Sequence, residues 1–173
     1  MRLSHAVASA VLPLDLDTVV RIKPYMGDIR LYQAMYGRPA DEVLREHDIL
    51  CTYNGSLAEQ FVAQELAASF GGNESHWWKR DARNAPAEVD FLVVREGRAQ
   101  PTVVKSGAAG RLKSIHQLMK EYPSVEDAIV FSSAPFGEVP EQRLEFFPFI
   151  TQAVWADVFF AYKRDDDRRR GAG

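Results

Sequence analysis

The chain has 173 residues, of which 46% are hydrophobic and 26% charged, a composition typical of one folded domain with an apolar core. Its 21 basic and 24 acidic side chains give a formal net charge of −3, which excludes a whole-molecule field that pulls the protein onto nucleic acid but leaves room for a local basic patch. The single cysteine, Cys51, excludes an intramolecular disulfide and a thiolate zinc cluster within one chain and fits a reducing cytoplasm.

The first residues, 1–22, are weakly patterned and contain Pro13, so we predict a lead-in segment that is flexible. The folded domain is expected over 23–164, followed by a charged tail at 165–173. The richest apolar run, 146–162, is interrupted by Pro148 and Asp157 and falls short of the roughly 20 apolar residues that span a bilayer. We therefore expect a cytoplasmic protein with no membrane partner.

Helical spacing of apolar side chains dominates the first half of the chain. The longest such segment has Leu57, Phe61, Val62 and Leu66 on helical spacing and ends before Gly71, which is typical of a helix stop. The segments predicted as helices here are 28–36, 40–46 and 52–70.

After residue 72 the chain changes to short runs of aromatic and β-branched residues separated by Asn, Pro and Gly, which predict strands. The expected elements, in chain order, are strands at 76–79, 88–94 and 101–105, a helix at 111–122, strands at 128–132 and 144–150, and a helix at 151–164. This order favours an α/β fold with a mixed sheet and helices on its faces.

Three charged residues stand inside these apolar elements. Asp90 begins the apolar part of its strand, Lys105 ends the next strand, and Glu59 shares a helix row with Val62 and Leu66. Buried charges must be paired or bound to a metal, because an isolated one costs several kcal/mol. We expect Glu59, Asp90 and Lys105 to lie near one another.

Three segments carry a family resemblance: GSLAEQFV at 55–62, EVDFL at 88–92 and PTVVKSG at 101–107. Together they resemble the PD-(D/E)XK nuclease superfamily, and more narrowly the domain of unknown function that follows an AAA-type ATPase module in many prokaryotic proteins. The segments KPYM at 23–26 and SIHQ at 114–117 also resemble that domain, so the resemblance extends over about 23–150.

The resemblance implies a restriction-endonuclease-like mixed sheet flanked by helices. It also implies that Asp90 and Glu59 are Mg²⁺ ligands and that Lys105 positions or activates the attacking water, which would make these three residues the catalytic set. Hard divalent cations prefer oxygen ligands, and the metal supplies hydroxide and stabilises charge on the phosphate.

The chain departs from the family pattern at Val103. The pattern has a carboxylate two residues before the lysine, and an aliphatic side chain cannot coordinate Mg²⁺. Side chains alternate along a strand, so Val103 shares a face with Lys105, and we expect that face to meet the Asp90 strand. Glu88 lies on the Asp90 face and supplies another oxygen only if the backbone brings it close.

Two interpretations follow for the site. In the first, Asp90, Glu59 and Lys105 form an active Mg²⁺-dependent endonuclease. In the second, catalysis is impaired, Asp90 and Lys105 form an ion pair, and the domain binds DNA, an ATPase module or another protein. A solvated helix position is an alternative for Glu59, and both interpretations of the site stay open.

A possible nucleic-acid contact is the basic group Lys79, Arg80 and Arg83, which follows two tryptophans. Basic side chains beside aromatic rings can hold a backbone and stack bases, although a surface charge cluster beside a buried tryptophan pair is more common. The glycine-containing loop 106–110 precedes Leu112, where a phosphate-binding loop needs glycine before its lysine. We therefore expect no bound nucleotide.

Overall fold

The computed structural model describes residues 2–35, 55–69, 75–82, 86–95, 97–105, 112–132 and 135–148. The helices predicted at 40–46 and 151–164, the tail at 165–173, the loop 106–110, Cys51 and Arg83 lie outside the described residues.

Within the described part of the chain, eight strands form one mixed sheet in the order β2-β1-β3-β4-β5-β6-β8-β7. This arrangement confirms the predicted α/β fold with a mixed sheet flanked by helices. The strands are β1 Arg2–Val7, β2 Ile22–Tyr25, β3 Ser75–Arg80, β4 Ala87–Arg95, β5 Arg98–Lys105, β6 Ala128–Ser132, β7 Gly137–Val139 and β8 Leu144–Pro148.

Strand pairing is parallel between β1 and β3, β5 and β6, and β6 and β8, and antiparallel elsewhere. The parallel step from β5 to β6 passes through helix α4, Lys113–Glu121, as a parallel connection requires a crossover. Among the described residues, two further helices precede β3, namely α1 Ile29–Met35 and α3 Ser56–Ser69. A short 3-10 helix at Pro140–Gln142 joins β7 to β8. No described helix is long and apolar enough to cross a membrane.

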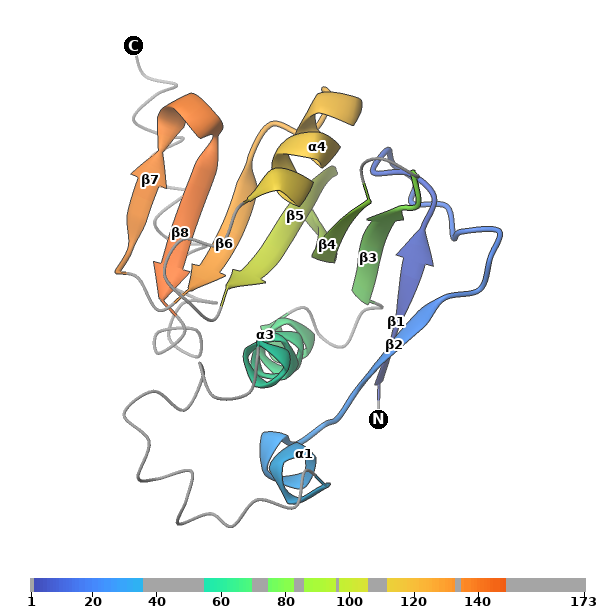
Figure 1. The fold of residues 1–173 in the computed structure, drawn as a ribbon, viewed down its shortest axis with the longest axis vertical. Coiled ribbons are helices and arrows are strands. Elements are labelled where there is room, and N and C mark those ends of the chain that lie inside the picture. Colours follow the sequence, from blue (N-terminus) through green and yellow to red (C-terminus); the bar gives the residue numbers. More distant parts are fainter. Residues whose placement is uncertain are drawn as a thin grey trace.

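The two faces of the sheet carry separate cores, one under each of the long helices. Ile115 and Leu118 of α4 pack with Trp78 and Val103 in one cluster. Ala58 and Val62 of α3 pack with Tyr25, Phe91 and Val104 in the other. Figure 1 shows α3 and α4 at different sides of the sheet, with α1 beyond α3. We refer to these as the α3 face and the α4 face.

The first 22 residues differ from the predicted lead-in. They contain β1, which lies between β2 and β3, and they place Val7 and Ala10, 1% and 2% exposed, in the α4-face core. The weak pattern has a physical reason, because β1 buries Ser4 completely and binds its hydroxyl to the Ser75 carbonyl at 3.0 Å. The folded unit therefore begins before residue 23.

Strand β4 contains a bulge at Asp90 and Phe91. Trp78 pairs with Val89 and His76 pairs with Leu92, so two β4 residues, Asp90 and Phe91, lie opposite the single residue Trp77. A bulge of this kind interrupts the regular alternation of side-chain direction along the strand. Val89 consequently packs in the α4-face core and Phe91 in the α3-face core, although they are two residues apart.

Candidate functional site

A cluster of charged side chains lies on the α3 face, where β2, α3 and β4 meet. Its central member is Lys23 of β2. The Lys23 Nζ atom is 3.2 Å from the Oε1 atom of Glu59 on α3 and 2.6 Å from the Oε1 atom of Glu88 on β4. We call Lys23, Glu59, Glu88 and Asp90 the lysine-centred cluster. One ammonium group therefore bridges two carboxylates that are 29 residues apart in the sequence.

Lys23 reaches this position because the strands beside it present small or flat side chains. Ser4 of β1 is its register partner, and Ala6, two residues further along β1, pairs with Trp77 of β3. The ammonium group lies 4.7 Å from the centre of the Trp77 ring, a distance at which a cation is attracted to the aromatic face. Small residues on β1 thus leave space for the long lysine side chain to cross toward β4.

The end of β2 is fixed to α3 by hydrogen bonds. The Tyr25 hydroxyl donates to Oε1 of Glu59 at 2.7 Å. The Met26 N–H donates to Oε1 of Gln60 at 2.9 Å, and Nε2 of Gln60 donates back to the Met26 carbonyl at 2.7 Å. Gln60 is 2% exposed, so both of its polar ends are satisfied by this segment, which holds the register of Lys23 against Glu59.

Electrostatics favour the charged form of Lys23 and the neutral form of Tyr25. Burial acts to lower the pKa of Lys23, but Glu59, Glu88 and Asp90 together outweigh it and raise the pKa above its ordinary value. Burial and the neighbouring Glu59 carboxylate raise the pKa of the Tyr25 hydroxyl. Lys23 is therefore a permanent cation here, and Tyr25 is a permanent hydrogen-bond donor.

Asp90 sits in the bulge with one carboxylate oxygen already used. Its Oδ2 atom accepts a hydrogen bond of 2.8 Å from the Val104 N–H of β5. Burial, and next the charge of Glu59, raise the pKa of Asp90 to about 6, against the opposing effects of the Val104 N–H, Lys23 and Lys105. The regular β4–β5 pairing ends at Phe91 and Thr102. Beyond this pair, the Asp90 side chain accepts the hydrogen bond from the β5 backbone.

Lys105 does not form the ion pair with Asp90 that one sequence interpretation predicts. Among the described residues, the hydrogen-bond partner of the Asp90 carboxylate is the backbone N–H of Val104. Lys105 acts on Asp90 only at longer range, as one of the charges that lower the pKa of Asp90. The physical reason is that Lys23, which the sequence interpretation does not include, is the lysine in contact with the carboxylates. Glu59 is partly buried and paired rather than a solvated helix position.

Val103 does not face the carboxylates, contrary to the prediction from strand alternation. It is 3% exposed and packs with Ile115 and Leu118 in the α4-face core, whereas Val104 packs on the α3 face. The bulge at Asp90 breaks the alternation on which the prediction depends. A carboxylate at position 103 would therefore enter the apolar core under α4.

The donor set fits a divalent cation poorly. No group of three or more His, Cys, Asp or Glu side chains suited to a metal ion occurs among the described residues. Glu59 and Glu88 each direct an oxygen to the Lys23 ammonium, and Asp90 directs one to a backbone N–H. Divalent cations prefer oxygen ligands. To reach the oxygens of this cluster, such a cation would have to displace the Lys23 ammonium, which repels it.

The described members of the predicted nucleic-acid-binding group lie in ion pairs. Lys79 is 3.3 Å from Asp81, and Arg80 is 3.2 Å from Glu121 of α4. Lys79 and Arg80 are neighbours on a strand and so point to opposite faces of the sheet. Their charges are partly neutralised, and they do not form one continuous basic surface.

A family model described as "Domain of unknown function (DUF4143)" matches residues 54–136, slightly less than half of the chain. The matched segment is similar to that family and includes Glu59, Trp77, Asp90 and Lys105, while Lys23 lies before it. No curated protein and no solved structure matches the chain.

Lys23 and Tyr25 are the site residues that the sequence reasoning does not identify. They precede Glu59 by 36 and 34 residues, on a short strand that contains Pro24 and has no clear strand pattern. The one available signal is the KPYM segment, which carries part of the family resemblance without indicating a role for its lysine.

Proposed function

We propose that this chain is a nuclease-fold module that does not cleave nucleic acid and that serves to bind a partner. The observation that supports this most strongly is the position of Lys23, whose ammonium lies between Glu59 and Glu88, on the face where the family resemblance implies a metal ion. An internal cation at this place satisfies the carboxylates and lowers their affinity for Mg²⁺ by direct charge repulsion.

A protein partner is better supported than the DNA backbone. Lys79 and Arg80 are already paired, and the net charge is −3. In contrast, the connection from β1 into β2 exposes large apolar side chains. These are Val11 (51%), Leu16 (54%), Val19 (54%), Val20 (85%) and Ile22 (47%). Apolar residues gathered on an exposed segment are typical of protein interfaces. The family resemblance makes an AAA-type ATPase module the first partner to test.

The catalytic half of the proposal is tested by incubation with linear, circular and single-stranded DNA in excess Mg²⁺ or Mn²⁺. We expect no cleavage. Metal-dependent cleavage that disappears in Asp90→Ala would instead support the alternative, an active endonuclease that uses Asp90, Glu59 and Lys105.

The partner half is tested by mixing the purified chain with the ATPase module of a protein in which that module precedes a matching domain. We expect a complex by size-exclusion chromatography that Val20→Asp weakens, with Val94→Asp, also at an exposed valine, as the control. Fluorescence anisotropy with DNA at physiological salt should show no saturable binding. Tight DNA binding that Lys79→Gln and Arg80→Gln weaken, with no ATPase complex, would contradict a protein partner.

A further inference from the structure

A second site lies on the other side of Tyr25 from the lysine-centred cluster. It is a cavity of about 920 Å³ between the second half of α3 and the strands β1, β3 and β4, within the size range of small-molecule sites. Tyr25 forms part of its wall, while the tyrosine hydroxyl is bonded to Glu59. The carboxylates of the cluster are not among the cavity-lining residues.

The space exists because α3 presents small side chains to it. Ala63 and Ala67, one helical turn apart, line the cavity together with Leu66. Residues four apart lie on the same face of a helix, so the two alanines leave a gap where larger residues would meet the strands. Much of the remaining wall is also apolar, including Leu3 and Val93.

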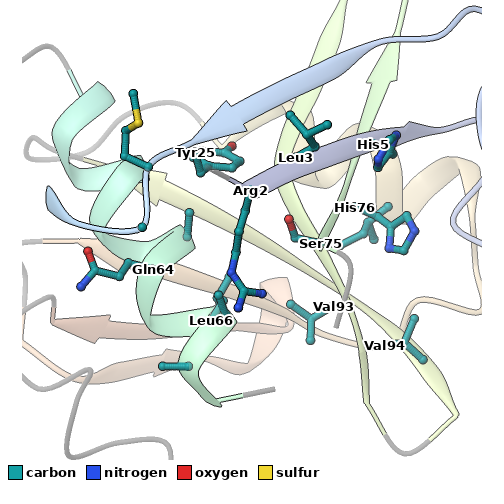
Figure 2. A pocket seen from close by; sticks show the side chains of 16 residues that line it. Arg2, Leu3, His5, Tyr25, Gln64, Leu66, Ser75, His76, Val93 and Val94 are labelled. Carbon is teal, nitrogen blue, oxygen red and sulfur yellow. The ribbon is translucent and has the colours of Figure 1, made fainter. Parts of the chain in front are cut away.

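The polar side of the cavity is basic. None of the sixteen described residues that line it is acidic, and they include Arg2, His5 and His76. His5 and His76 are register partners on β1 and β3, so the two imidazoles lie on neighbouring strands. Figure 2 shows the Arg2 side chain extending from β1 into the middle of the lining residues, with the histidines to one side.

Arg2 is the group most available to a ligand. Among the described residues its guanidinium makes no hydrogen bond or ion pair, unlike Arg21, which binds two aspartates. Guanidinium groups match the two oxygens of a carboxylate or phosphate. An apolar wall next to these donors suits a ligand with both an anionic group and an apolar body.

We propose that this cavity binds a small organic anion with an apolar body, whose carboxylate or phosphate group contacts Arg2 and whose apolar part lies against Ala63, Ala67 and Leu66. The inference does not depend on the proposed function, because none of the four residues of the lysine-centred cluster lines the cavity. Tyr25, whose hydroxyl contacts Glu59, contributes only part of the wall.

Isothermal titration calorimetry with octanoate, octyl phosphate and octanol tests this proposal on the full chain. We expect saturable one-to-one binding of at least one of the two anions, and the tighter of the two identifies the head group. Octanol should bind roughly tenfold more weakly or worse, since it lacks the charge-assisted hydrogen bonds.

Two variants locate the site. Arg2→Gln should weaken anion binding roughly tenfold, a loss typical of one charge-assisted contact, and Ala67→Phe should abolish it by filling the cavity. Arg98→Gln, at an exposed arginine paired with Glu126 on the β4–β5 side of the sheet, is the control and should leave binding unchanged. Equal binding of octanol and octanoate, no effect of Arg2→Gln, or no saturable binding of either anion would each overturn the proposal.

Discussion

Lys23 determines how the carboxylates of this protein can act. Its side chain is 20% exposed and that of Glu59 is 27% exposed, so the pair is only partly screened by water. An ammonium group supplies charge compensation without the open coordination positions of a metal ion. We therefore expect the lysine-centred cluster to stabilise the fold and to oppose metal binding.

Removal of Lys23 should destabilise the fold. Lys23→Met leaves Glu59, Glu88 and Asp90 without their shared cation, and a broken buried pair costs about 3 to 5 kcal/mol. Partial exposure reduces this, so we expect a loss of about 1 to 3 kcal/mol in urea denaturation. Lys79→Met is the matched control, because its partner Asp81 is about half exposed, and its loss should stay within about 0.5 kcal/mol. Equal losses in the two variants would contradict a special role for Lys23.

Asp90 should make stability depend on pH with a definite sign. Its pKa is raised from 3.8 to about 6 in the folded chain. Below about pH 4 both states are protonated; between about pH 4 and 6 the unfolded chain loses its proton first, so folding becomes less favourable as pH rises. The Asp90 contribution to stability is therefore highest in acid and is reduced by up to about 3 kcal/mol at neutral pH.

Asp90→Asn removes this titration and keeps an oxygen to accept the Val104 N–H. We expect the variant to match the parent near pH 4 and to be about 1 to 3 kcal/mol more stable at pH 7, as measured by urea denaturation at both values. If the free energies of unfolding of the two proteins differ by the same amount at pH 4 and pH 7, the pKa of the Asp90 carboxyl is not raised by its surroundings.

At the scale of elements, the bulge in β4 separates Asp90 from Val103. It places Asp90 and Phe91 opposite Trp77 and leaves Val103 in the α4-face core. A restored acidic motif at position 103 should therefore not restore a metal site.

Val103→Glu should destabilise the protein without increasing Mn²⁺ binding. A carboxylate buried under α4 has no partner there, and its cost is about 3 to 5 kcal/mol. Val94→Glu, at a neighbouring strand position that is 45% exposed, should change stability by about 0.5 kcal/mol or less. Thermal unfolding and calorimetry with Mn²⁺ measure both effects. A folded Val103→Glu protein that binds Mn²⁺ tightly would contradict the placement of position 103 in the α4-face core, away from Asp90.

The same bulge explains why the sequence predicts the site only in part. Charge inside apolar elements correctly draws attention to Glu59 and Asp90, both of which belong to the cluster. Strand alternation then assigns Val103 to the wrong face, because no glycine or other local signal marks the bulge at Asp90. The contact of Lys23 with Glu88 depends on the pairing of β2 with β1 and of β1 with β3, which no local pattern encodes.

At the scale of the whole molecule, the sheet unites segments that sequence patterns treat separately. Strands β3 to β6 follow clear apolar runs, and the predicted segments coincide closely with them. Strand β1 is missed because Ser4 and His5 interrupt its pattern, and β2 and β7 because they contain only four and three residues. Pairing with neighbouring strands, not local propensity, forms these strands.

The first strand should accordingly contribute to global stability. Val7 is 1% exposed in the α4-face core, so Val7→Ala should cost about 2 kcal/mol through lost burial and a residual cavity. Val11→Ala, at a position 51% exposed, should cost no more than about 0.5 kcal/mol. Chemical denaturation of the two variants compares them directly, and equal midpoints would mean that residues 1–22 are the flexible lead-in after all.

The most direct measurement of the central claim is a calorimetric titration of the unaltered protein and of Lys23→Met with Mn²⁺. If the lysine ammonium holds the place of a cation, the unaltered protein gives no saturable binding. Lys23→Met, in which Glu59, Glu88 and Asp90 lose that ammonium and can rearrange around an ion, then binds Mn²⁺ more tightly than the unaltered protein, and Lys79→Met does not. Saturable binding of Mn²⁺ by the unaltered protein that is lost in Asp90→Ala, with no gain in Lys23→Met, would contradict the account.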